Sequence, residues 1–138
     1  MKKLLYIFIL LSFACKQKVQ QPAISISLTN GQKSLQVKGF DAVILGEISR
    51  DSSIEAWQSL IPVYRVPADT DLKSYQPVQP GSYQLKDSSV IFTPDTPFVK
   101  GQNYFVRSYN LSGKTLGDYV KGSTRPGQLH FTDLIFKQ

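Results

Sequence analysis

Apolar and polar residues alternate in short runs along most of the chain after residue 22, and turn-forming residues separate the runs. Residues 23–28 alternate strictly, as a half-buried strand does. Asn30-Gly31 follows and strongly favours a hairpin, because both residues accept positive φ. We therefore predict that residues 23–28 pair with a returning strand at residues 34–37.

The same pattern predicts further strands in the rest of the chain. They are residues 42–48, 63–66, 82–86, 90–93, 104–109 and 129–136. Pro80-Gly81 suits a type II turn before one of them, and Asp87-Ser88-Ser89 suits a hairpin connection. About seven to eight strands with regular turn signals are typical of an all-β sandwich. We predict one such domain over residues 22–138.

One stretch breaks the strand pattern and predicts a short helix. Ser52, with Glu55 three residues later, resembles a capping box. Apolar residues then recur at helical spacing around Trp57, and Pro62 ends the run. We predict one helix over about residues 53–60 with Trp57 facing the core. A Trp in a binding groove is the alternative.

The first residues follow a different pattern. Lys2-Lys3 precedes an apolar run at residues 4–14, and Cys15, the only cysteine, follows Ala14. This is the layout of a secretory signal peptide, and its end at a cysteine resembles a bacterial lipoprotein signal. Ser12 stands where the lipobox usually has leucine. The resemblance implies a signal peptide over residues 1–14, acyl chains (palmitate among them) on Cys15, and a polar tether over residues 15–21.

Two alternatives to the lipoprotein signal remain open. A spanning helix needs about 20 apolar residues, and residues 4–14 provide only 11. A plain secretory signal followed by an ordinary cysteine is the second alternative. By the sorting rule of well-studied lipoproteins, Lys16 after the cysteine favours an outer membrane, with the periplasmic or outer face undecided. With one cysteine, an exported domain has no internal disulfide and depends on its core.

The charge is unevenly distributed along the chain. The formal net charge is +6, but residues 39–95 hold eight acidic and four basic side chains, whereas residues 96–138 hold six basic and two acidic ones. The asymmetry indicates a basic surface for anionic lipid, lipopolysaccharide or an acidic glycan, or ordinary solvated strand faces. No run of basic residues with interleaved aromatics indicates nucleic acid.

Residues 90–106 contain a distinctive pattern. A strand ends in Thr-Pro, Phe98 lies six residues before Tyr104, and Gly101 lies three before it. This resembles the tyrosine corner of Greek-key sandwiches and is similar to the pattern of bacterial Ig-like domains of the S-layer-protein type. The resemblance implies an Ig-like Greek-key β-sandwich in which the Tyr104 hydroxyl bonds to upstream backbone. It also implies a role as a spacer, binding module or accessory domain.

The residues provide little for catalysis or metal binding. His130 is the only histidine and lies in a predicted strand, so neither a Ser-His-Asp site nor a common zinc site is expected. Asp69 and Asp71 are compatible with calcium, and a polar turn explains them equally well. Asp41 and Glu47 would lie ~20 Å apart on an extended strand, too far for a glycosidase pair. We predict a non-enzyme without cofactor or metal, with a small hydrolase as a minor alternative.

Tyrosines beside Pro or Gly turns indicate a ligand surface, since exposed Tyr is common at interfaces and stacks on sugars. Packing at the sandwich edges is the alternative. The candidate ligand-binding residues are Tyr75, Tyr83, Tyr119, Lys121 and Arg125. The sequence predicts a non-catalytic, membrane-anchored envelope lipoprotein whose domain binds or spaces another envelope component. Glycan binding by these tyrosines and the basic C-terminal half is the alternative.

Overall fold

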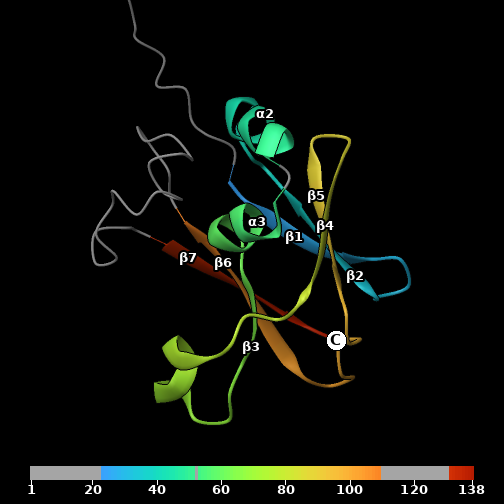
Figure 1. The fold of residues 1–138 in the computed structure, drawn as a ribbon. Coiled ribbons are helices and arrows are strands. Elements are labelled where there is room, and N and C mark those ends of the chain that lie inside the picture. Colours follow the sequence, from blue (N-terminus) through green and yellow to red (C-terminus); the bar gives the residue numbers. More distant parts are fainter. Residues whose placement is uncertain (1–22, 52, 110–130) are drawn as a thin grey trace, which may run out of the picture.

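The computed structural model describes residues 23–51, 53–109 and 131–138, and these are mostly β (Figure 1). One antiparallel sheet has the strand order β1-β2-β5-β4, and the other has the order β3-β6-β7. The strands are β1 (Ser25–Thr29), β2 (Ser34–Lys38), β3 (Val63–Arg65), β4 (Gly81–Lys86), β5 (Ser89–Pro94), β6 (Asn103–Tyr109) and β7 (Phe131–Lys137). The predicted predominance of β structure is confirmed, and the two antiparallel sheets are consistent with a β-sandwich.

Both sheets contribute to one hydrophobic core. The buried apolar side chains from the strands are Leu35, Val37, Val63, Val90, Phe92, Tyr104 and Val106. The helices α2 (Ala42–Asp51) and α3 (Ile54–Leu60) add Leu45, Ile48, Trp57 and Leu60 to the same core. In Figure 1 these helices lie towards one end of the sheets, and the 3₁₀ helix η2 (Thr70–Tyr75) lies towards the other.

Both predicted hairpins form, with turns that use positive φ. Asn30 has φ 53° and Gly31 has φ 63°, in a connection from Thr29 to Ser34. The β4–β5 connection has Asp87 at φ 49° and Ser88 at φ 60°, as a two-residue turn with the twist of a hairpin requires. These turns fix the register of the two hairpins.

The predicted strand at residues 42–48 is wrong, because this segment forms α2. Asp41 begins the helix, and its Oδ1 accepts a hydrogen bond from the Val43 N–H at 2.7 Å. Leu45 and Ile48, three residues apart, are both buried. A short apolar run fits a buried strand and a buried helix equally well, and the capping aspartate was the missed signal. The described residues therefore contain two α-helices, where one was expected.

The predicted helix around Trp57 is confirmed as α3, with a different cap. Ser53 is the N-cap residue, and its Oγ accepts a hydrogen bond from the Ala56 N–H at 3.2 Å. Ser52, the predicted cap, lies outside the described residues. Trp57 is 4% exposed, so it faces the core as predicted rather than a groove. Its ring stacks on Tyr83 at 5.9 Å between centroids.

The predicted type II turn at Pro80-Gly81 is also wrong. Gly81 is the first residue of β4 and lacks the positive φ that this turn requires. A Cβ on Gly81 would lie 2.5 Å from the Thr93 carbonyl oxygen and 2.6 Å from the Phe92 ring. Glycine is needed here because the neighbouring strand and its core ring approach closely.

Candidate functional site

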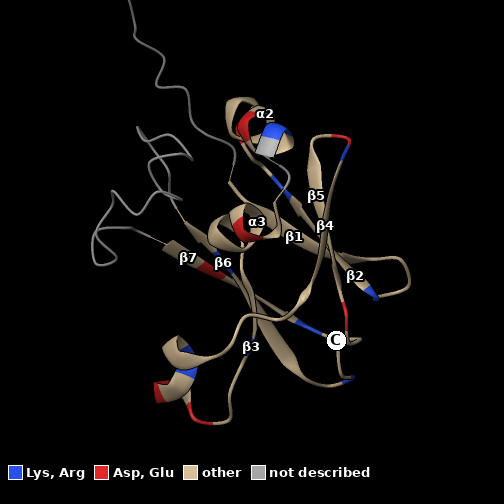
Figure 2. Cartoon of the chain, in the orientation of Figure 1, with Lys and Arg blue, Asp and Glu red and all other residues tan. Residues whose placement is uncertain are grey.

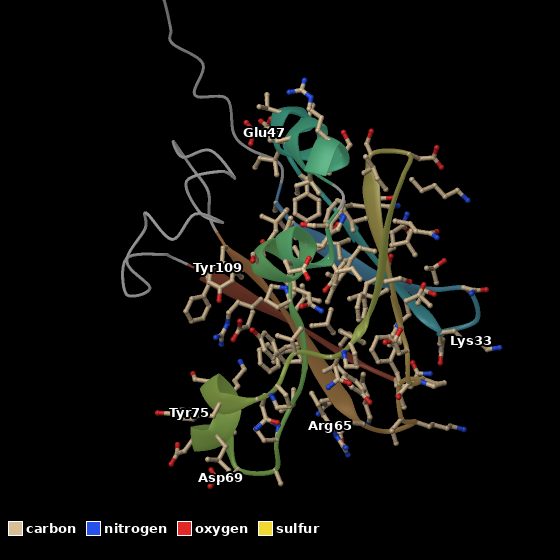
Figure 3. All side chains as sticks on the ribbon, viewed as in Figure 1. Lys33, Glu47, Arg65, Asp69, Tyr75 and Tyr109 are labelled. Carbon is tan, nitrogen blue, oxygen red and sulfur yellow. The ribbon has the colours of Figure 1, made fainter. Side chains whose placement is uncertain are left out.

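The outer face of the β3-β6-β7 sheet carries aromatic and charged side chains together. Tyr109, at the end of β6, is labelled in Figure 3. Successive side chains of a strand point to opposite faces. Since Tyr104 and Val106 lie in the core, Phe105, Arg107 and Tyr109 of β6 point outward. In the β6–β7 register, Asp133 lies opposite Arg107 and Phe131 opposite Tyr109. We call this set of outward residues, with Tyr64 of β3, the outer face.

The segment between β3 and β4 covers part of the outer face. Lys73 of η2 places its Nζ 4.6 Å from the centroid of the Phe105 ring. Phe105 is fully buried although it does not belong to the core between the sheets. The segment then returns along β3, where the Gln79 N–H donates to the Val63 carbonyl at 2.7 Å. The η2 segment is thus held on this face at two places.

Asp133 connects three elements through hydrogen bonds to two cations. Arg107 donates from Nε to Oδ1 at 2.9 Å and from Nη2 to Oδ2 at 3.1 Å, and Lys73 Nζ lies 2.8 Å from Oδ2. The Arg107 guanidinium also lies 4.0 Å from the centroid of the Phe131 ring. A bidentate arginine–carboxylate pair has a well-defined geometry, and ring contacts restrict it further. We call these three charged residues the Asp133 network.

Asp133 and Arg107 are both charged at neutral pH. Burial by itself would raise the pKa of Asp133, but the hydrogen bonds from Arg107 and Lys73 outweigh it and hold that pKa below its ordinary value. The hydrogen bond to Asp133 raises the pKa of Arg107. The network therefore joins β6, β7 and η2 by charge as well as by packing.

Asp133→Asn is expected to lower the free energy of unfolding at neutral pH by about 1–3 kcal/mol. It is also expected to make that free energy depend less on pH in the acid range. The Asp133 pKa in the folded state lies below the unfolded value, so its contribution is present above the unfolded pKa. It is lost as the pH falls through the folded pKa. Urea unfolding from neutral pH to about pH 3 measures this. Asp95→Asn, at an exposed carboxylate, is the control, and equal curves for the two variants would contradict the assignment.

The structure separates the predicted ligand-binding tyrosines. Tyr75 lies on η2 and is 82% exposed, beside Leu72 at 50%. Tyr83 is partly buried against the core, with its ring 4.8 Å from Phe92 and its hydroxyl donating to the Ile61 carbonyl at 3.4 Å. Burial strongly raises the pKa of Tyr83. Tyr83 therefore lacks the open ring face that sugar stacking needs.

Several other predicted residues lie outside the described part of the chain. These are Cys15, Tyr119, Lys121, Arg125 and His130. Figure 2 shows the described acidic and basic residues spread over the sheets, helices and turns rather than gathered on one face. In the described part of the basic C-terminal half, Arg107 is paired with Asp133. The described residues thus form no basic patch of the expected kind.

The three residues of the predicted corner lie together where β6 begins, with Tyr104 as the second residue of that strand. The Tyr104 hydroxyl accepts a hydrogen bond from the Val99 N–H at 2.9 Å. Gly101 has φ 80°, and its N–H donates to the Gln138 carbonyl at 2.9 Å. The Phe98 ring packs 4.8 Å from the Tyr104 ring. This corner carries the chain from β5 in one sheet to β6 in the other.

The acidic residues considered for chemistry have structural surroundings. Asp41 begins α2 and Glu47 lies within it, so the extended spacing assumed for this pair is wrong. The Asp69 carboxylate accepts a hydrogen bond from the Asp71 N–H at 3.0 Å, which caps η2. Within the described ranges, no group of three or more His, Cys, Asp or Glu side chains is placed to hold a metal ion.

A shallow depression of about 540 Å³ lies near the start of β6, lined by Arg65 and Gln102 among others. Two of its polar side chains, Arg65 and Gln102, are already bonded within the fold. Arg65 donates to the Gln102 side chain at 2.9 Å, and Gln102 donates to the Val66 carbonyl at 3.0 Å. The depression therefore carries no assembled site.

No family model, no curated protein and no solved structure matches this chain. In the described residues no helix has the length and apolar character needed to cross a membrane.

The Asp133 network was not predicted from the sequence. Alternation did place Arg107 and Asp133 in predicted strands, but only the strand register shows that they meet.

Proposed function

We propose that this protein is a non-catalytic, membrane-anchored envelope lipoprotein whose Ig-like domain binds another envelope protein. The strand order carries the domain assignment. The order β1-β2-β5-β4 in one sheet and β3-β6-β7 in the other corresponds to the ABED and CFG sheets of a constant-type Ig sandwich. Tyr104, at the second position of β6, stands where the tyrosine corner of that fold occurs. Helices α2 and α3 are additions between β2 and β3.

The anchor assignment is supported by the N-terminal pattern. Cys15 directly follows an apolar run too short for a spanning helix. One acyl chain binds a membrane only marginally, whereas two or more give a stable anchor. A lipidated Cys15 and the short tether after it would keep the domain close to the bilayer. Lys16, the residue after the cysteine, favours an outer membrane by the sorting rule of well-studied lipoproteins.

Binding, rather than spacing alone, is favoured by Tyr75. It is 82% exposed on a segment that the Asp133 network and the contact with β3 hold in place. Tyrosine is enriched at protein interfaces, and a surface ordered before binding loses less entropy when a partner docks. We therefore assign η2, with Tyr75 and Leu72, as the surface for an envelope protein.

A cross-linking pull-down of the full-length protein from intact cells tests this function. Wild type is expected to recover one abundant envelope protein, and Tyr75→Ala to recover several-fold less. Val99→Ala is the matched control, because Val99 is an exposed apolar residue at 51% on a different surface. Recovery of bulk membrane proteins alone, or equal recovery by all three proteins, would count against the proposal.

Glycan binding is the second candidate, and the exposed Tyr75 on η2, the 3₁₀ helix that begins with the Asp69 cap and Asp71, favours it. An aromatic face with nearby acceptors suits sugar rings and their hydroxyl groups. A glycan array with the full-length protein distinguishes it from the first. A response that Tyr75→Ala abolishes would support sugar binding, and a flat array with unchanged intrinsic fluorescence would remove it.

A further inference from the structure

Within residues 23–51, 53–109 and 131–138, strand β7 has one edge along which no strand pairs. It is the outer strand of the order β3-β6-β7, and no described strand pairs with its other side. The Gln138 N–H donates to the Gln102 carbonyl at 3.2 Å, so residue 138 and every second residue before it bond towards β6. In an antiparallel ladder these positions alternate. The backbone groups of Phe131, Asp133, Ile135 and Lys137 therefore point away from β6.

The opposite edge of the same sheet is protected. Tyr64 of β3 forms a bridge with Val78, and the Gln79 N–H donates to the Val63 carbonyl. On β7 the outward side chains include Phe131 at 49% and Ile135 at 62% exposure. A strand edge of seven residues without proline is a template for pairing with another chain. In the described part of the chain the β7 edge lacks such a bridge, so it is the edge of this sheet that another strand could extend.

We propose that β7 pairs in antiparallel fashion with β7 of a second copy of this chain, about a two-fold axis through Ile135. The three-stranded sheets of two copies would then form one continuous sheet. The proposal goes beyond the proposed function and does not depend on the lipid anchor. Confinement to a membrane would strengthen the pairing by raising the effective concentration.

The side chains of β7 favour a second copy because the strand is complementary to itself in this register. Ile135 lies opposite Ile135 of the second copy, and Asp133 lies opposite Lys137 on both sides of the axis. Such cross-strand apolar and opposite-charge pairs stabilise antiparallel sheets. Moving the axis to Asp133 or to Lys137 would place like charges opposite each other. An interface of this kind is isologous and closes at a dimer.

Disulfide trapping of full-length variants in intact cells tests the register. In Ile135→Cys the two Cα atoms would lie about 5.5 Å apart, within the range for a disulfide. Non-reducing gels are expected to show a dimer at several-fold the level of Phe131→Cys. That control lies on the same strand and face, but its two copies would be about 27 Å apart. Wild type, whose only cysteine is Cys15, shows how much dimer a disulfide through Cys15 would give. Equal dimer from both variants, or none from Ile135→Cys, overturns the proposal.

The mass of the full-length protein in detergent gives a second, independent measurement. Light scattering is expected to show a dimer for wild type and a monomer for Ile135→Lys, which places two cations on the axis. Lys137→Glu would place two acidic side chains opposite each other, at position 137 and at Asp133 of the second copy. The dimer of this variant is expected to dissociate at a higher protein concentration than the wild-type dimer. Lys86→Glu is the control at an exposed lysine on β4, an edge strand of the other sheet, and circular dichroism checks folding. A monomeric wild type, or a dimer unchanged by Ile135→Lys, overturns the proposal.

Discussion

Cys15→Ser is expected to move the protein from the membrane fraction to the soluble fraction of the envelope. The apolar run at residues 4–14 is unchanged in this variant, so export proceeds, but the thiol that would carry the acyl chains is missing. Each buried CH₂ of an acyl chain contributes about 0.8 kcal/mol to membrane binding, so the loss of two or three chains removes nearly all affinity. Fractionation of cells after a high-salt wash, with palmitate labelling of the protein, measures the effect.

The outcomes of this experiment separate the three interpretations of the first residues. If wild type takes up no palmitate and still stays in the washed membrane, the apolar segment itself is the anchor and the lipoprotein assignment is wrong. If wild type is already soluble and its Cys15 thiol is free by intact mass, the segment is a plain secretory signal. Ala14→Ser, which keeps a small residue before the cysteine, is the control expected to retain the label.

The strand pattern was predictable because alternation and turn chemistry agree along much of the chain. Asn30-Gly31 supplies the positive φ that its hairpin needs, and the strands on either side alternate. The segment at residues 42–48 failed because apolar content alone does not distinguish strand from helix. There the burial of Leu45 and Ile48, one helical turn apart, depends on packing against α3 and the sheets.

The candidate surface was predictable only in part. Tyr83 and Tyr75 both stand near Pro or Gly. Their position beside turns therefore gave no reason to prefer one over the other as a ligand-binding residue. The alternation of Tyr83 with Ser82 and Gln84 already placed it on the inner face of β4, where it lies opposite Phe92. The Asp133 network could not be predicted, because Arg107 and Asp133 are 26 residues apart and meet only through the β6–β7 register.

Phe98→Ala is expected to destabilise the domain by about 3–5 kcal/mol, the usual cost of removing a buried aromatic ring. Phe98 is 7% exposed and contacts three rings, with centroids 4.8 Å away in Tyr104, 5.2 Å in Phe136 and 6.4 Å in Phe92. These rings come from both sheets, so the cavity would loosen the packing between them. Urea unfolding followed by Trp57 fluorescence measures the change, and Val99→Ala, at the exposed neighbour, is expected to cost far less.

Tyr104→Phe separates the hydrogen bond of the corner from its packing. It keeps the ring that Phe98 contacts and removes only the hydroxyl that accepts from the Val99 N–H, for an expected loss of about 1–2 kcal/mol. If the two residues act as one unit, adding Tyr104→Phe to Phe98→Ala should cost less than Tyr104→Phe alone. Full additivity would mean that the hydroxyl holds the turn without help from Phe98, and the corner would then be two independent contacts.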